Sequence, residues 1–151
     1  MKEITLEIPE EKPELFEFTQ NNLPGIVYAN SALKKCELKE VFVWHLSIVI
    51  NLKNLIENGM PSSEEREIVD PFGEELERRI CGNTKKPNAL FLARVTWNAT
   101  REILFRVYDP EVANEYLQEV VSSQSYPREF DYRMEEDFEW EKTKFYLGDY
   151  Q

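Results

Sequence analysis

The sequence predicts an α+β protein with a ferredoxin-like βαββαβ order: a four-stranded antiparallel sheet with both helices on one face. From residue 40 onward, strand-like and helix-like patterns follow one another as strand, helix, strand, strand, helix, strand. The 151 residues, 42% of them hydrophobic, are enough for one domain with a buried core. We therefore expect a single domain, in which residues 1–36 form an N-terminal extension packed on a core of residues 40–147.

The N-terminal quarter has the weakest pattern. Residues 1–8 alternate between apolar and polar side chains, which is typical of a short strand. Pro13 suits the first turn of a helix, so we expect a short helix from Pro13 to about Asn22. A second strand is expected over residues 25–30. Residues 41–51 are rich in β-branched and aromatic side chains and predict the first strand of the core.

The first long helix has a clear start. Ser62 and Glu65 have the spacing of a capping box, and apolar residues then recur at helical spacing. Gly82 is a natural C-terminal stop. The pair Asp70-Pro71 falls inside this run, and proline has no amide donor. We therefore expect the helix to kink or restart there, with Asp70 as a second cap.

The second half of the chain predicts a hairpin, a helix and a last strand. Strands over residues 89–97 and 101–108 are joined by a short loop. An Asp-Pro pair at 109–110 caps and opens the second helix, whose apolar residues repeat every three to four positions. Residues 128–135 alternate again. Residues 138–146 are expected to form a final helix or an extended tail.

Alternation along strands assigns side chains to the two faces of the sheet. The expected helix-facing set is apolar and comprises Phe91, Ala93, Val95, Trp97, Ile103, Phe105, Val107, Phe130, Tyr132 and Met134. The opposite face is mixed, and its candidate binding residues are Arg94, Arg106, Arg133, Tyr108 and His45. Arginine binds carboxylate or phosphate with a bidentate fork, so these residues suggest a site for an anion or an acidic partner. The alternative is that acidic segments of the same chain cover this face and pair with the arginines.

Composition restricts the classes of partner. The formal net charge of −11 disfavours nucleic acid and anionic membranes, and it is compatible with basic protein partners. One histidine and two cysteines without a C-x-x-C motif cannot make a Cys/His zinc site, and five glycines form no phosphate-binding loop. We therefore expect neither a metal nor a cofactor, and no catalytic residues are assigned.

The expected compartment is the cytoplasm. The N-terminus lacks the apolar segment of a signal peptide, and no apolar run is long enough to span a bilayer. Cys36 and Cys81 are accordingly expected to be reduced and buried, although a disulfide between them stays open.

Several motifs, taken in order, resemble those of a known family. They are Asn58-Gly-Met-Pro61 followed by Glu64 and Glu65, the hairpin from Arg94 to Asp109, and Asp137-Phe-Glu-Trp140. Together they are similar to the uncharacterised bacterial family called domain of unknown function 695, over roughly residues 25–147. Ala99 stands where that family often has glycine. The family is similar in fold to the RraB-type regulators of ribonuclease E.

The resemblance implies a non-enzymatic role, in which the protein binds or regulates a protein partner such as a ribonuclease. Candidate contacts for a partner are Trp140, Phe145 and Tyr146, unless these side chains pack on the sheet. The alternative function is that of a small enzyme or anion binder that uses the Arg/Tyr/His cluster of the mixed face. The oligomeric state is not predicted.

Overall fold

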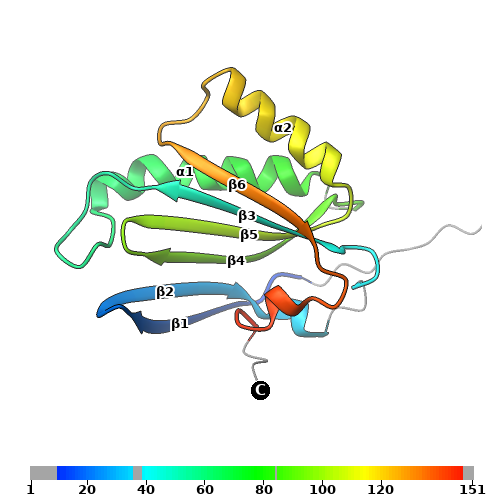
Figure 1. The fold of residues 1–151 in the computed structure, drawn as a ribbon, viewed down its shortest axis with the longest axis horizontal. Helices are drawn as coiled ribbons and strands as arrows, with labels where there is room; N and C mark the ends of the chain where they lie inside the picture. The colour runs from blue at the N-terminus through cyan, green and yellow to red at the C-terminus, as the bar shows by residue number, and fades with distance from the viewer. Residues whose placement is uncertain (1–9, 36–38, 84, 148–151) are drawn as a thin grey trace, which may run out of the picture.

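The computed structural model describes residues 10–35, 39–83 and 85–147, which form an α+β fold built on one six-stranded antiparallel sheet (Figure 1). The strands are β1 (Pro13–Gln20), β2 (Leu23–Asn30), β3 (Trp44–Asn51), β4 (Ala89–Trp97), β5 (Thr100–Val107) and β6 (Phe130–Glu136). The helices are α1 (Ser63–Cys81) and α2 (Pro110–Ser122), and the short 3₁₀ turns are η1 (Ser31–Lys35) and η2 (Glu141–Thr143). The expected α+β class is confirmed. The strand expected over residues 1–8 and the residue Cys36 lie outside the described residues.

The strand order along the sheet is β1-β2-β4-β5-β3-β6, and every neighbouring pair is antiparallel. Strand β3 lies between β5 and β6, the two neighbours expected for the first core strand. The sheet is larger than expected, because the β1-β2 hairpin adds two strands beside β4. Its order is therefore not that of a simple four-stranded βαββαβ sheet.

The helix expected from Pro13 to about Asn22 is wrong, because this segment forms β1. Phe16 and Phe18 alternate with polar residues and pack on one face of the sheet. Proline is tolerated in an edge strand, so Pro13 does not oppose this pattern. Asn21 and Asn22 have φ values of 53° and 63°, which suit a two-residue hairpin turn. This Asn-Asn pair between two strand-like segments is the signal that the sequence interpretation missed.

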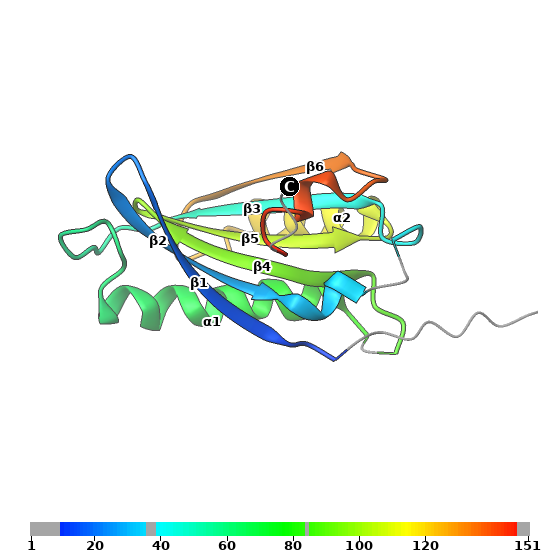
Figure 2. The ribbon, with the colours of Figure 1, turned by 90° about the horizontal axis from the view of Figure 1, so that it is seen from below.

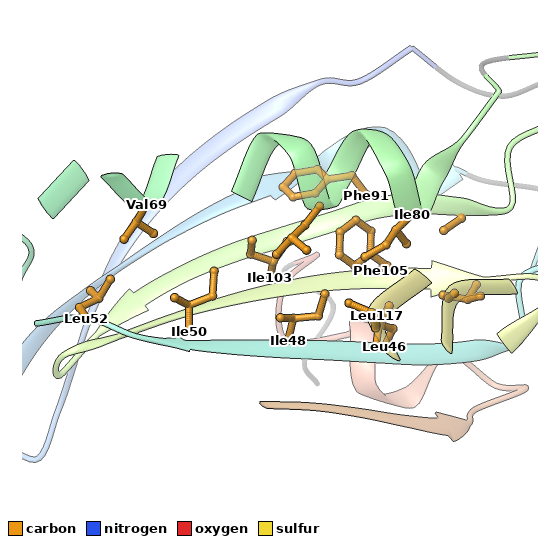
Figure 3. Packing of buried hydrophobic residues seen from close by; sticks show 14 residues of the cluster. Leu46, Ile48, Ile50, Leu52, Val69, Ile80, Phe91, Ile103, Phe105 and Leu117 are labelled. Atoms are coloured by element: carbon orange, nitrogen blue, oxygen red, sulfur yellow. The ribbon is translucent and has the colours of Figure 1, made fainter. Parts of the chain in front are cut away.

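Both helices cover the same face of the sheet, as Figures 1 and 2 show from two directions. Apolar side chains from α1, α2 and the central strands meet there in the first core cluster, which includes Leu46, Ile48, Leu76, Phe105 and Leu117 (Figure 3). Each fully buried side chain of this size contributes about 1.5–3 kcal/mol relative to exposure. This cluster holds the two helices against β3, β4 and β5.

Helix α1 begins at the expected cap but continues through its proline. The hydroxyl of Ser62 accepts a hydrogen bond from the Glu65 N–H at 3.1 Å. The helix does not restart at Pro71, and Asp70 forms an ion pair with Arg101 instead of acting as a second cap. Apolar residues on both sides of the proline are buried against the sheet, so tertiary packing holds the helix together where its own backbone lacks a hydrogen bond.

A β-bulge in β4 changes the expected assignment of faces. The register between β4 and β5 shifts between Phe91 and Ala93. Phe91 belongs to the cluster under the helices, whereas Ala93 and Val95 belong to the cluster on the opposite face. The expectation that these three residues share one side is therefore wrong, because the extra residue of a bulge reverses the alternation beyond it. Arg94 consequently lies on the helix side and not on the mixed face.

The face opposite the helices, which we call the open face, is partly covered by the end of the chain. Residues 137–147, here named the C-terminal segment, cross this face (Figure 2). Trp140 and Leu147 from this segment are buried in a second cluster with Leu92 and Leu104 from the sheet. The segment consists of successive tight turns around η2, so it is neither the final helix nor the extended tail expected from the sequence, and its aromatic residues pack it on the sheet.

Candidate functional site

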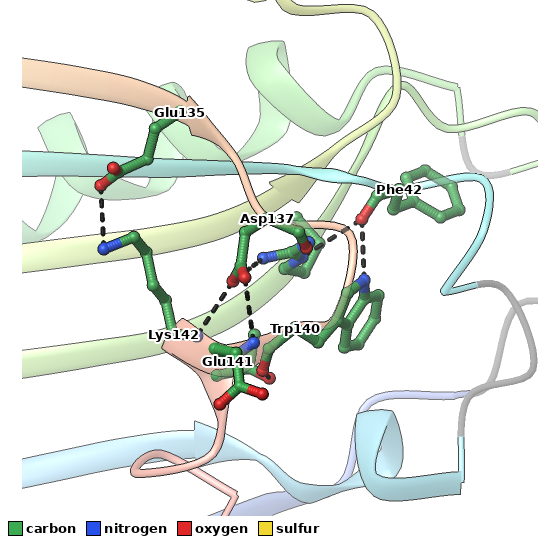
Figure 4. A network of polar contacts seen from close by, with 8 residues as sticks. Phe42, Glu135, Asp137, Trp140, Glu141 and Lys142 are labelled. Carbon is green, nitrogen blue, oxygen red and sulfur yellow. Dashed lines mark hydrogen bonds and ion pairs between the residues drawn. The ribbon is translucent and has the colours of Figure 1, made fainter.

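Arg106 anchors the C-terminal segment to the sheet. It projects from β5 on the open face and has an exposed fraction of 0%. Its Nη1 and Nη2 atoms donate to the Asp137 carboxylate at 3.0 Å and to the Asp137 carbonyl at 2.6 Å, and its Nε donates to the Phe42 carbonyl at 3.2 Å (Figure 4). The guanidinium lies 4.7 Å from the centre of the Trp140 ring. Arg106 is therefore fully engaged by its own chain.

The Asp137 carboxylate is bound both by Arg106 and by backbone N–H groups of its own segment. Its carboxylate also accepts the backbone N–H groups of Glu141 at 3.0 Å and Lys142 at 2.9 Å, as Figure 4 shows. Burial alone would raise the pKa of Asp137, but the two backbone hydrogen bonds and the Arg106 guanidinium hold that pKa below its usual value. The carboxylate thus stays charged and ties the turn η2 to β5.

The aromatic residues expected to contact a partner lie in this segment. Trp140 is 1% exposed and donates its Nε1–H to the Phe42 carbonyl at 3.0 Å, so the indole packs on the sheet and is not presented to a partner. Its backbone has a φ of 55°, a left-handed value that turns the chain back across the face. Tyr146 is half-buried, and Phe145 is 47% exposed and contacts the rings of Phe16 and Phe18 at their edges.

A groove of about 770 Å³, named here the open-face groove, runs between the C-terminal segment and strands β3 and β6. Its charged lining residues are Glu102, Asp131, Arg133, Glu135, Glu141 and Lys142. Four carboxylates therefore face two cations. Lys142 pairs with Glu135 at 3.1 Å (Figure 4), whereas Arg133 has no ion pair within the described part of the chain. The groove is thus acidic in balance.

The strand register places these residues in rows across the open face. His45 lies between Arg106 of β5 and Glu135 of β6, and Ser47 lies in the next row beside Arg133. The hydroxyl of Ser47 donates to the Glu102 carboxylate at 2.5 Å. Glu102 was not a sequence candidate, although it shares a face with Arg106 by simple alternation along the same strand.

His45 is the buried polar group of the groove. It is 6% exposed, it lines the groove, and its Nδ1 has no hydrogen-bond partner among the described residues. Burial and, secondly, the positive charge of Arg106 lower the pKa of His45 to about 4. The imidazole is therefore neutral near pH 7 and has an unused nitrogen.

The five residues predicted for the mixed face do not all gather. His45, Arg106 and Arg133 lie together on β3, β5 and β6. Arg94 lies instead on the helix side because of the bulge, 3.6 Å from Glu77 of α1. Tyr108 follows the end of β5, is 59% exposed, and is not part of the groove lining.

Other arginines pair with acids of the same chain. Arg101 forms an ion pair with Asp70. Arg128 binds the fully buried Glu65 through two hydrogen bonds of 2.8 and 2.7 Å. The hydrogen bonds from Arg128 lower the pKa of Glu65 to about 2 despite its burial. The interpretation that the arginines serve the chain's own carboxylates thus describes Arg94, Arg101, Arg106 and Arg128.

The described residues contain no cluster of three or more His, Cys, Asp or Glu side chains arranged for a metal ion. Within the same part of the chain, neither helix combines the length and the apolar character needed to cross a membrane. Cys81 is a free, half-buried thiol, and burial raises its pKa to about 12.

Fold and site together define an α+β protein with a six-stranded antiparallel sheet, helices on one face and an acidic groove on the other. A family model, the Family of unknown function (DUF695), matches residues 14–147. The chain belongs to this family. The match confirms the family named from the sequence motifs. No curated protein and no solved structure matches the chain.

Proposed function

We propose that the protein is a non-enzymatic binding module that receives a basic segment of a protein partner in the open-face groove. The observation that carries this proposal is the charge of the groove, with four carboxylates against two cations, in a chain of net charge −11. Complementary charge accelerates encounter and selects partners. A basic segment is therefore the ligand that this surface favours.

The geometry of the groove favours binding over chemistry. The Ser47 hydroxyl donates to Glu102, so it is not directed at the imidazole of His45 as a nucleophile would be directed at its base. The Nδ1 of His45 has no hydrogen-bond partner among the described residues, but the atom is itself buried, so it is not presented to a substrate in the groove. The alternative of an anion site loses its strongest residue, because Arg106 is buried against Asp137.

A regulatory role in the bacterial cytoplasm is part of the proposal. The order β4-β5-β3-β6, with α1 and α2 on one face, supports describing this part of the fold as ferredoxin-like. A ferredoxin-like core is compatible with the expected similarity in fold to RraB-type regulators of ribonuclease E. A ribonuclease with a basic segment is therefore one candidate partner. Likeness of fold does not by itself establish function, so the groove carries the argument.

A fluorescence anisotropy titration tests the proposal. The probe is a labelled nine-residue peptide in which lysine alternates with valine, and the comparison peptide replaces lysine by glutamate. We expect the lysine peptide to bind and to weaken as salt is raised, while the glutamate peptide does not bind. Failure of the lysine peptide to bind at low salt would overturn the proposal.

Matched variants locate the binding surface. The groove variant is Asp131→Asn with Glu135→Gln, and the control is Glu67→Gln with Glu74→Gln on exposed positions of α1, so both remove two charges. We expect the groove variant to weaken peptide binding about tenfold, equal to about 1.4 kcal/mol, and the control to change it little. Equal weakening by the two variants would mean that net charge alone attracts the peptide.

A further inference from the structure

We propose that the basic segment binds as an additional antiparallel strand on β6. This inference depends on the proposed function and specifies the conformation of the partner. Strand β6 is the last strand of the sheet and, within the described residues, pairs with β3 alone. An unpaired edge presents backbone donors and acceptors to any extended chain that approaches it.

The register shows which backbone groups of β6 are available. The Asp137 N–H donates to the Val43 carbonyl at 2.8 Å, and the Asn51 N–H donates to the Glu129 carbonyl at 2.9 Å. Hydrogen-bonded pairs alternate along an antiparallel ladder, so the odd-numbered residues of β6 face β3. The N–H and C=O groups of Phe130, Tyr132 and Met134 therefore point away from the sheet.

One of these groups is already occupied by a side chain. The Tyr132 N–H donates to the carboxylate of its neighbour Asp131 at 2.9 Å. While no strand is bound at β6, this contact satisfies the hydrogen-bonding need of the Tyr132 N–H. The charge of Asp131 also disfavours pairing with unrelated chains, since natural edge strands commonly carry charged residues for that purpose. A carbonyl of an arriving strand would take the Tyr132 N–H, and Asp131 would then be released to meet a basic side chain.

Carboxylates flank the β6 edge on both faces of the sheet. On the open face these are Asp131 and Glu135, with Arg133 between them on the same side of the strand and Lys142 paired with Glu135. On the helix side, a second groove of about 420 Å³ lies between α2 and β6 and contains Glu111 and Glu115 beside Trp44 and Met134. An added strand thus fits best with lysine or arginine beside Asp131 and Glu135 on the open face and with apolar residues toward Trp44 and Met134.

The other edge of the sheet does not suit the same ligand. The groove of about 530 Å³ beside β1 contains three arginines and no carboxylate, and Arg66 among them has no ion pair within the described residues, whereas Arg94 and Arg101 pair with Glu77 and Asp70. The unpaired Arg66 would repel a basic segment. On β1 itself, Glu14 is paired with Lys34 at 3.5 Å, and Glu17 is the carboxylate without an ion pair among the described residues of this strand. The edge at β6 has more carboxylates beside it, so it is the more favourable edge for a basic strand.

The experiment uses the full chain and two modified forms of the Lys/Val peptide, N-methylated either at every valine or at every lysine. In a strand antiparallel to β6, residues that share the helix side with Tyr132 direct their N–H groups at β6. We expect valine methylation to weaken binding at least tenfold and lysine methylation to change it less than threefold. The opposite pattern, equal effects or no effect would overturn antiparallel strand addition. If the unmethylated peptide itself fails to bind, the proposed function fails with it.

A second measurement tests the helix-side flank. The variant Glu111→Gln with Glu115→Gln removes charges that a ligand confined to the open-face groove would not contact, but that an added strand would lie beside. Because the valines and not the lysines of the added strand face this flank, we expect this variant to change binding of the lysine peptide less than threefold relative to the Glu67→Gln, Glu74→Gln control. A loss as large as that of the Asp131→Asn, Glu135→Gln variant would place the lysines on the helix side and contradict the proposed orientation of the strand.

Discussion

Arg106 and Arg133 project from neighbouring rows of the open face, but their surroundings differ. Arg106 is completely buried between Asp137, the Phe42 carbonyl and the Trp140 ring. Arg133 is exposed in the groove and forms no ion pair within the described chain. The same residue type therefore has a structural role at one position and none in the fold at the other.

This difference predicts opposite effects of the same substitution. Arg106→Ala leaves the Asp137 carboxylate buried without its cation, so we expect the free energy of unfolding to fall by about 3–5 kcal/mol. Arg133→Ala, the control, should change it by less than about 0.5 kcal/mol. Chemical denaturation followed by tryptophan fluorescence measures both. A small loss for Arg106→Ala would mean that the C-terminal segment does not depend on this pair.

His45 predicts a dependence of stability on pH. Its pKa is about 4 in the folded protein and near 6.5 in an unfolded chain. The unfolded chain therefore binds the proton more readily, so the contribution of His45 to stability rises with pH from about 4 to 6.5. The difference amounts to at most about 3 kcal/mol. We expect His45→Gln to lose this part of the pH dependence in denaturation measured at pH 4.5 and pH 7.

The comparison must be made between variant and wild type, because another group titrates in the same range. Burial and, secondly, Glu11 raise the pKa of Glu77 to about 7, although Arg94 acts in the opposite direction. Glu77 thus makes the folded protein less stable as pH rises from about 4.5 to 7, the reverse of His45. If the wild-type and His45→Gln profiles were parallel, the role given to His45 would be wrong.

At the scale of elements, β1 and β2 depend on one close approach. The ring of Phe18 lies over Gly25, and a Cβ atom at Gly25 would stand only 2.2 Å from that ring. We expect Gly25→Ala to destabilise the protein by about 1–3 kcal/mol, because the ring must leave its place against Phe145. Thermal denaturation measures the effect.

A second variant separates this clash from a general effect of alanine in a strand. In a Phe18→Ala background the ring is absent, so Gly25→Ala should cost much less than it does with Phe18 present. The same cost in both backgrounds would show that the ring is not the reason for glycine at position 25.

The elements differ in how far local patterns predicted them. The caps of α1 and α2 and the β4-β5 hairpin follow from short-range chemistry, and the structure contains them where expected. The hairpin turn at Asn98 and Ala99 has positive φ at both residues, a conformation that glycine adopts more readily than alanine. In contrast, Pro13 indicates the start of a helix, whereas Phe16 and Phe18 follow the period-two pattern of the strand that the structure contains.

At the scale of the molecule, the C-terminal segment completes the fold by covering the apolar half of the open face. Trp140 is the residue through which it does so, whereas Phe138, two positions earlier, is 61% exposed. We expect Trp140→Ala to cost about 3–5 kcal/mol and Phe138→Ala less than about 0.5 kcal/mol. Binding of a hydrophobic dye should rise for Trp140→Ala alone. If both variants behaved alike, the segment would not be an integral part of the core.

Most of the kinds of elements and the caps of both helices could be read from the amino-acid order, because periodicity and capping depend on neighbours a few positions apart. The face on which Arg94 lies could not, since one extra residue in β4 reverses the alternation and is visible only against β5. The charge of the groove also needed the tertiary structure, because Asp137 neutralises Arg106 from 31 residues away. Long-range pairing decides which charges remain free, and those charges define the ligand that the open face can bind.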